Sequence, residues 1–208
     1  MLGASLAFSV PKTAEGSGRT VLVTSAVASE GKSTTAANLA LAQTESGHRV
    51  LLIDCDLTRP SLHKLFDLGQ SPGLAQVLRN QVAVEDAIRP TELGLGVLPA
   101  GRVERGSALT FRHAQFTALL RRLHESYDLV IMDAPPVLMM ANAIVMATAA
   151  DAVLLVIRAG QTDRAAVQDA VSQLRLVGAR LVGPVLNDPD GELPRYSGNY
   201  YGSYAAHG

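Results

Sequence analysis

Short runs of apolar residues recur along the chain, and none of them alternates polar with apolar positions. Five are clear, at residues 20–24, 50–53, 129–132, 153–157 and 181–186, and a weaker sixth lies at 95–98. Runs of this length without alternation are typical of strands buried on both faces. The pattern therefore predicts a parallel sheet that is covered by helices on both sides.

Amphipathic helices are predicted between these strands. Phe116, Leu119, Leu120 and Leu123 follow the spacing i, i+3, i+4, i+7, and residues 167–174 repeat it. Strand alternating with helix predicts an α/β fold with a doubly wound, mostly parallel sheet flanked by helices. In such folds, ligands bind beyond the carboxyl ends of the strands.

Residues 137–157 are apolar over a length that could span a bilayer. Asp151 would be costly there, and a Pro-Pro pair precedes the run, so we interpret it as a helix followed by a buried strand. The first ten residues lack the positive charge of a secretory signal. We therefore expect a cytoplasmic chain with no transmembrane segment.

Composition narrows the class of protein further. The 208 residues suit one domain, predicted at 1–187, and a formal net charge of -1 gives no whole-protein attraction to nucleic acid. The single cysteine, Cys55, excludes an intrachain disulfide and a cysteine-rich zinc site. From 188 to 208 the sequence turns to Gly, Ser, Tyr and Ala, which predicts a flexible tail.

A phosphate-binding loop is predicted between the first strand and a helix over residues 33–43. The spacing G-x-x-x-x-G-K-[ST] is met from position 26 to Ser33, except that Ala26 replaces the first glycine. Lys32 would then reach the β- and γ-phosphates of ATP, and Ser33 would coordinate Mg²⁺. The predicted nucleotide-binding residues of this loop are Ala28, Ser29, Glu30, Gly31, Lys32, Ser33 and Thr34.

Aspartates end two of the predicted strands. Asp54 and Asp56 follow the second strand, and Asp133 closes the run at 129–132. Carboxylates at the carboxyl ends of strands point into the crevice where the phosphate loop opens. One of them can hold Mg²⁺ while another accepts a proton from an attacking hydroxyl.

Tyrosines cluster at the end of the chain. Four of the five, Tyr196, Tyr200, Tyr201 and Tyr204, lie in the last thirteen residues, where average frequency would place roughly 0.3. In a segment without apolar partners they gain nothing as core residues, whereas as phosphoacceptors each would gain about -1.5 to -2 charges.

Four segments, at 23–25, 30–40, 50–66 and 127–137, resemble the bacterial tyrosine kinases, the cytoplasmic P-loop kinases of capsule and exopolysaccharide assembly. This family is related to the ParA/MinD-type deviant Walker ATPases. The resemblance runs from about residue 19 to 187, with the Walker A, A′ and B motifs at 26–34, 53–60 and 130–133. It implies ATP and Mg²⁺ as cofactors, tail tyrosines as autophosphorylation sites, protein tyrosine substrates, and a membrane adaptor that activates the kinase at the inner membrane.

Residue roles follow from the same resemblance. Lys32, Ser33 and Thr34 would contact phosphates and metal, and Asp133 would hold Mg²⁺ through water. Asp54 would activate the tyrosine hydroxyl or support the metal, with Asp56 beside it. Asn187 would lie near the adenine. Arg59 and Arg158 either line the site or are surface arginines after a strand.

The chain departs from the family pattern in three places. The E-x-x-R-x-x-R helix that the family uses for ring-like self-association is not found before the first strand, although a homo-oligomer remains an expectation. The segment N-P-x-E-L-L is replaced by residues 105–110, and the aspartate a few residues after the Pro-Pro pair is Asn142.

Two other functions fit parts of the pattern. A ParA/MinD-like ATPase switch shares the Walker motifs, but it carries a second lysine early in the loop, where this chain has Val27. A catalytically weak, ATP-binding scaffold of a polysaccharide export complex would fit the missing E-x-x-R-x-x-R helix and Asn142.

Overall fold

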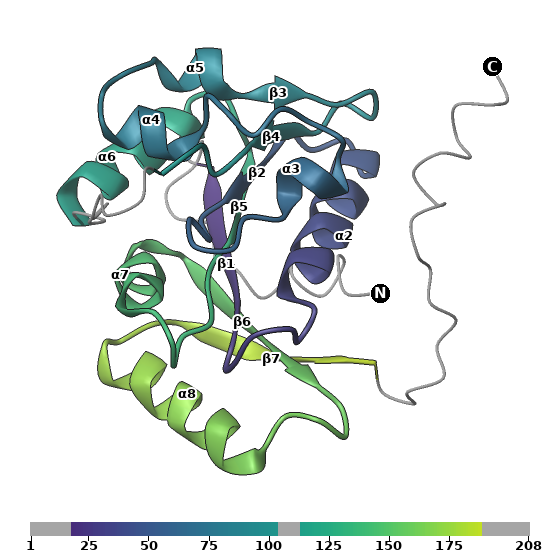
Figure 1. Ribbon diagram of the computed structural model, residues 1–208, viewed down its shortest axis with the longest axis vertical. Helices are drawn as coiled ribbons and strands as arrows, with labels where there is room; N and C mark the ends of the chain where they lie inside the picture. Colours follow the sequence, from purple (N-terminus) through teal and green to yellow (C-terminus); the bar gives the residue numbers. More distant parts are fainter. Residues whose placement is uncertain (1–17, 104–112, 189–208) are drawn as a thin grey trace, which may run out of the picture.

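The computed structural model describes residues 18–103 and 113–188, which form a seven-stranded sheet with helices on both faces (Figure 1). The strands are β1 (Arg19–Ser25), β2 (Val50–Asp54), β3 (Arg89–Pro90), β4 (Gly96–Leu98), β5 (Leu129–Asp133), β6 (Ala152–Arg158) and β7 (Leu181–Asn187). The helices are α2 (Lys32–Glu45), α3 (Leu62–Leu65), α4 (Leu74–Leu78), α5 (Val84–Ala87), α6 (His113–His124), α7 (Ala141–Ala149) and α8 (Arg164–Leu176).

The strand order is β3-β4-β2-β5-β1-β6-β7, and every neighbouring pair is parallel except β3 with β4. Helices α2 and α3 lie on one face of the sheet, and α6, α7 and α8 lie on the other (Figure 1). This is the mostly parallel, doubly wound architecture that the apolar runs predicted.

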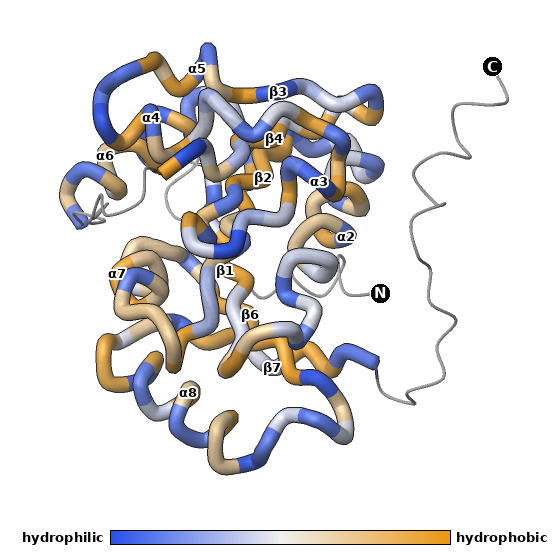
Figure 2. The backbone as a smooth tube through the Cα atoms, in the orientation of Figure 1, coloured by the Kyte–Doolittle hydropathy of each residue, from blue (hydrophilic) through white to orange (hydrophobic). Residues whose placement is uncertain are grey.

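Each face of the sheet has its own hydrophobic core. The α2 side is filled by small residues of the helix, such as Ala36 and Ala40, against strand residues such as Leu52 and Ile131. On the other side Phe116 and its apolar neighbours of α6 pack on the sheet. Figure 2 shows the central strands as mainly hydrophobic and the outer turns as mainly hydrophilic. Strands enclosed in this way explain why their sequences do not alternate.

The five clear strands, the weaker sixth and the helices predicted around 33–43, 116–123 and 167–174 are all present. The apolar stretch at 137–157 is helix α7 followed by strand β6, as interpreted from its sequence. Within the described ranges, no helix combines the length and apolar character that crossing a bilayer requires. The sequence did not predict β3 or helices α3, α4 and α5, because elements of two to five residues are too short to show a period.

The order of the central strands positions the acidic residues. Strand β5 lies between β1 and β2, and its Asp133 is in register with Val23 of β1 and with Asp54 of β2. Parallel strands in register end at the same edge of a sheet. Two aspartates that are far apart in sequence therefore come side by side at the point where the loop after β1 begins.

The buried core makes a first prediction about stability. Replacing Leu52, which is fully buried, with alanine should lower the free energy of unfolding by about 3 kcal/mol, because the truncation leaves a cavity. Leu176→Ala is the matched control, since Leu176 is 85% exposed and should change it by less than about 0.5 kcal/mol. Urea unfolding of both variants tests this, and equal losses would contradict the assigned core.

Candidate functional site

The loop between β1 and α2 has the shape of a phosphate-binding loop. Ser29 and Gly31 both have positive φ, 66° and 87°, and helix α2 begins at Lys32. The helix start aims unpaired backbone N–H groups, with the positive end of the helix dipole, at the space in front of the loop. Ala26, which replaces the first glycine, is fully buried and is not among the described residues with positive φ, so an alanine fits there without strain.

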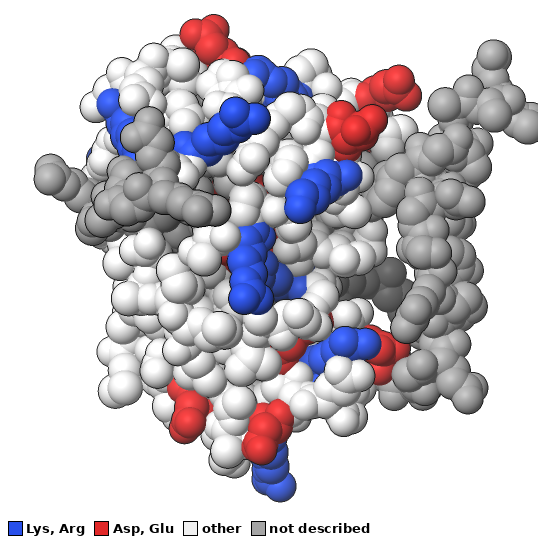
Figure 3. Space-filling model, viewed as in Figure 1, with Lys and Arg blue, Asp and Glu red and all other residues white. Residues whose placement is uncertain are grey.

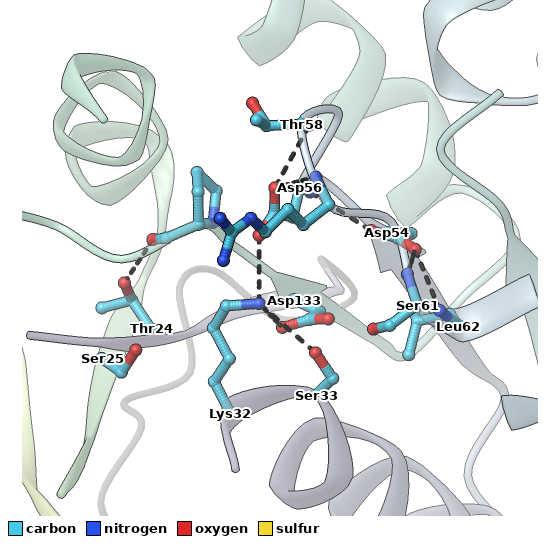
Figure 4. A network of polar contacts seen from close by, with 12 residues as sticks. Thr24, Ser25, Lys32, Ser33, Asp54, Asp56, Thr58, Ser61, Leu62 and Asp133 are labelled. Atoms are coloured by element: carbon cyan, nitrogen blue, oxygen red, sulfur yellow. Dashed lines mark hydrogen bonds and ion pairs between the residues drawn. The ribbon is translucent and has the colours of Figure 1, made fainter. Parts of the chain in front are cut away.

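The Lys32 ammonium lies at the centre of the site (Figure 4). Its Nζ is 3.2 Å from Asp56 Oδ2, 3.5 Å from Asp133 Oδ1 and 3.3 Å from Ser33 Oγ. Burial acts to lower the pKa of Lys32, but the neighbouring carboxylates outweigh it and the pKa is raised. The site thus holds a buried cation against carboxylates from two different strand ends.

Asp54 organises the loop that follows β2. Its Oδ2 accepts hydrogen bonds from the backbone N–H groups of Ser61 (2.9 Å) and Leu62 (3.0 Å), and its Oδ1 accepts one from Asp56 (3.2 Å). The residue is fully buried. Burial, with the nearby charge of Asp133, raises the pKa of Asp54 to about 7 in spite of these donors.

Asp133 presents an oxygen atom that the protein leaves without a partner. The side chain is fully buried, and its Oδ2 is one of the described buried side-chain atoms that make no hydrogen bond. Burial raises its pKa to about 6, although Lys32 acts in the opposite direction. An unpartnered buried carboxylate oxygen is costly, and a metal-bound water or a metal ion would satisfy it.

Asp56 lies on the other side of Lys32. Its Oδ1 accepts hydrogen bonds from the backbone N–H groups of Thr58 (3.2 Å) and Arg59 (2.9 Å), which leaves Oδ2 for Lys32.

The Arg59 side chain is exposed. Figure 3 shows Lys and Arg side chains gathered at the centre of the face where β1 and α2 meet. Positively charged side chains on this face favour the approach of an anionic ligand.

Asn187, at the end of β7, lies against the phosphate loop. Its Nδ2 donates a hydrogen bond to the Glu30 carbonyl oxygen at 3.0 Å. A Cβ on Gly31 would collide with this amide, so glycine is required there by space as well as by φ. Arg158 pairs with Asp188 at 3.2 Å instead of reaching the carboxylates around Lys32.

The structure thus brings Lys32, Ser33, Asp56 and Asp133 into direct contact and places Asp54 and Asn187 at the edges of that group. Ala28, Ser29, Glu30 and Thr34 belong to the same loop and the first turn of α2, and Asn142 is half-buried on α7. The phosphoacceptor candidates Tyr196, Tyr200, Tyr201 and Tyr204, with most of the predicted tail and the altered segment 105–110, lie outside the described residues. The roles of all these residues remain predictions.

Sequence reasoning missed the residues that support the site from other loops. Thr162 donates to the Glu30 carboxylate, and the backbone N–H groups of Ser61 and Leu62 hold Asp54. A single threonine after a strand belongs to no recognisable motif. A backbone N–H group is present in every residue except proline, so the sequence does not show which of them will act as donors. Only the position of Ser61 and Leu62, seven and eight residues after Asp54, could have suggested a returning loop.

Fold and site together define a nucleotide-binding protein of the P-loop class. The family model described as an AAA domain matches residues 19–182. Tyrosine-protein kinase YwqD of Bacillus subtilis (strain 168) is 36% identical over 187 residues, which is 89% of this chain and 78% of that protein. Some curated relatives are much longer, and the chain spans only about a quarter of their length.

Solved structures of a bacterial tyrosine kinase domain and of a related ATPase are also similar to this chain. The kinase domain of the Escherichia coli tyrosine kinase ETK superposes with a TM-score of 0.81 at 28% identity, over 96% of this chain and 78% of that chain. The cell division ATPase MinD of Pyrococcus furiosus superposes with a TM-score of 0.72 at 27% identity, over 86% and 76%. The chain belongs to the bacterial tyrosine-protein kinase family, as its motifs indicated.

The raised carboxyl pKa values predict how stability depends on pH without nucleotide. Asp54 and Asp133 have folded-state pKa values of about 7 and about 6, above the unfolded value of about 4. The folded state therefore binds more protons than the unfolded state between pH 4 and pH 7, so stability should fall as pH rises through that window.

The variant Asp133→Asn should flatten this decline, because it removes one titrating carboxyl and its repulsion of Asp54. The measurement is the urea midpoint of both proteins at pH 4.5, 5.5, 6.5 and 7.5. Parallel curves for the two proteins would contradict the assignment of the proton uptake to this pair.

Proposed function

We propose that the protein is a MgATP-dependent protein-tyrosine autokinase that phosphorylates the tyrosine cluster of its own tail. The observation that carries the proposal is the position of Lys32, which lies at the mouth of α2 between carboxylates from the ends of β2 and β5. Family membership supports phosphoryl transfer to tyrosine in particular, since many P-loop proteins share the site but not the acceptor.

The residues present fit a nucleotide with its magnesium ion. Backbone N–H groups at the start of α2 suit phosphate oxygens, and the unpartnered Oδ2 of Asp133 suits a magnesium ion or its water. When bound, MgATP would supply the phosphoryl group and a metal ion that offsets the negative charge of the phosphates. We assign Ser33 and Asp133 to the metal side of the site, with Asp54 supporting the metal or activating the tyrosine hydroxyl, and Lys32 and Thr34 to the phosphates.

Asp54 and Asp56 form the part of the site that receives the proton of an incoming tyrosine hydroxyl. A pKa of about 7 for Asp54 suits a group that takes up a proton near neutral pH. Asp56 lies directly on Lys32 and can orient the hydroxyl. Asn187 donates through Nδ2 to Glu30, which leaves its side-chain oxygen to accept from an adenine amino group.

The setting of the reaction follows from the family resemblance. We propose that the kinase acts in the cytoplasm beside the inner membrane and is recruited and activated there by the cytoplasmic segment of a membrane adaptor. Its output would regulate the synthesis and export of a capsular or extracellular polysaccharide. Self-association into a homo-oligomer remains part of the proposal, and protein tyrosines other than its own would be further substrates.

One observation separates this proposal from the ATPase-switch alternative. The loop position that carries a second lysine in the ParA/MinD-type switches is Val27, whose N–H is bonded to the Glu30 carboxylate at 2.8 Å. No cation from this position can reach across a dimer to a neighbouring nucleotide. ATP-dependent dimerisation with hydrolysis and no tyrosine transfer would favour the switch, whereas tight nucleotide binding without turnover beside an intact adaptor would favour the scaffold.

Replacing Lys32 with methionine should reduce tyrosine phosphorylation by roughly a hundredfold or more, because the phosphates and the developing charge lose their central cation. Lys64→Met is the matched control, since Lys64 is exposed on α3, and it should retain activity. Phosphotyrosine is measured after incubation with ATP and Mg²⁺, both with and without the cytoplasmic segment of the adaptor. Undiminished labelling of the Lys32 variant would refute the proposed site.

Mass-spectrometric mapping of the wild-type protein after the same incubation should place phosphate on Tyr196, Tyr200, Tyr201 and Tyr204. Changing these four residues together to phenylalanine should remove most of the label, whereas Tyr127→Phe should not, because Tyr127 lies beside β5 and is half-buried. Label confined to residues outside the tail would contradict the assignment of the acceptors.

A further inference from the structure

The phosphate loop contains two residues in a left-handed backbone conformation. Ser29 and Gly31, on either side of Glu30, both have left-handed φ values. For a serine this conformation is unfavourable, and it persists only where surrounding contacts impose it. The contacts that could impose it here converge on Glu30.

Glu30 is held at both of its carboxylate oxygens. Its Oε2 accepts the backbone N–H of Val27 at 2.8 Å, across the loop, and its Oε1 accepts a hydrogen bond from the hydroxyl of Thr162. The residue is only 2% exposed, so water does not compete for these bonds. A buried carboxylate that lost one of its donors would pay a large part of its desolvation cost.

Thr162 is itself fixed from the loop after β6. Its hydroxyl oxygen accepts the backbone N–H of Arg158 at 2.9 Å, and its own N–H donates to the Arg158 carbonyl at 3.0 Å. The adjacent Ala159 N–H donates to the Asn187 carbonyl at 2.9 Å. Asn187 in turn donates to the backbone oxygen of Glu30. Residues at the ends of β6 and β7 therefore hold Glu30 through hydrogen bonds to both its side chain and its backbone.

We propose that Thr162 is a positioning residue for nucleotide binding, which acts through Glu30 to hold the phosphate loop in its binding shape before the nucleotide arrives. Without Thr162 the loop would have to be ordered during binding, and the nucleotide would bind more weakly by that cost. The inference rests on the proposed function only in requiring that the protein binds nucleotide.

The test measures the affinity of the full chain for MgADP by titration calorimetry. Thr162→Val, which keeps the side-chain shape and removes the hydroxyl, should weaken binding about tenfold, which is the scale of one hydrogen bond to a charged group. Thr162→Ser keeps the hydroxyl and should bind within about twofold of wild type. Thr148→Val is the matched control, since Thr148 is exposed on α7 and bonds only to Val145 and His113 among the contacts described.

Kinetics and a double-mutant cycle separate positioning from general destabilisation. In tyrosine phosphorylation, Thr162→Val should raise KM for ATP about tenfold and leave kcat within about twofold. Glu30→Ala should weaken MgADP binding at least as much, and the double variant should be no weaker than Glu30→Ala alone, because both changes break one contact. If Thr162→Val fails to fold, Thr162→Ala, which also removes the hydroxyl, takes its place in the affinity, KM and double-mutant measurements, with the same expected results.

Three results would overturn the inference while the wild type binds normally: wild-type affinity in Thr162→Val, a serine variant as weak as the valine variant, or fully additive losses in the double variant. A wild-type protein that does not bind MgADP would instead refute the proposed function, and the role of Thr162 with it. The two failures are therefore distinguishable.

Discussion

The structure of the site depends on one buried cation among carboxylates. Lys32 is only 9% exposed, and it lies within 3.5 Å of carboxylate oxygens from Asp56 and Asp133, with Asp54 behind them. Burial, with a smaller contribution from the repulsion between neighbouring carboxylates, raises the pKa values of Asp54 and Asp133 even with the lysine present. The arrangement is costly for a nucleotide-free protein, and a bound metal ion would reduce that cost. Stability and function therefore pull in opposite directions at this point of the fold.

The sheet makes this arrangement possible. Because β5 lies between β1 and β2, the strand that leads into the phosphate loop and the strand that ends in Asp54 both border Asp133. The small side chains of α2 allow the helix to pack closely on the same strands, which fixes the direction in which Lys32 enters the site. The ends of β6 and β7 complete the frame from the other side, through the hydrogen bonds that reach Glu30. Five of the seven strands thus contribute to one small volume at the carboxyl edge of the sheet.

Much of the fold could be predicted from the sequence, because its long elements carry strong periodic patterns. The uninterrupted apolar runs identified the six longest strands, and the spacing of Phe116, Leu119, Leu120 and Leu123 identified α6. Short elements such as β3 and α5 were not predictable, since four residues or fewer cannot show a period and are held in place by the rest of the fold. In the site, the residues that belong to local motifs were predictable in position. Thr162 was not, because its partner Glu30 is 132 residues away in the chain.

By itself, then, the sequence determined the class of fold, the phosphate loop and the identity of the acidic residues, since each is written in contiguous residues whose chemistry is local. The tertiary structure alone decided which atoms meet. It put Asp56 and Asp133 on Lys32, turned both oxygens of Asp54 toward the backbone of its own loop, left Oδ2 of Asp133 without a partner, and joined Glu30 to Thr162. The physical reason is that strand order and register, which set these distances, arise from packing of the whole sheet and are not encoded at any single position.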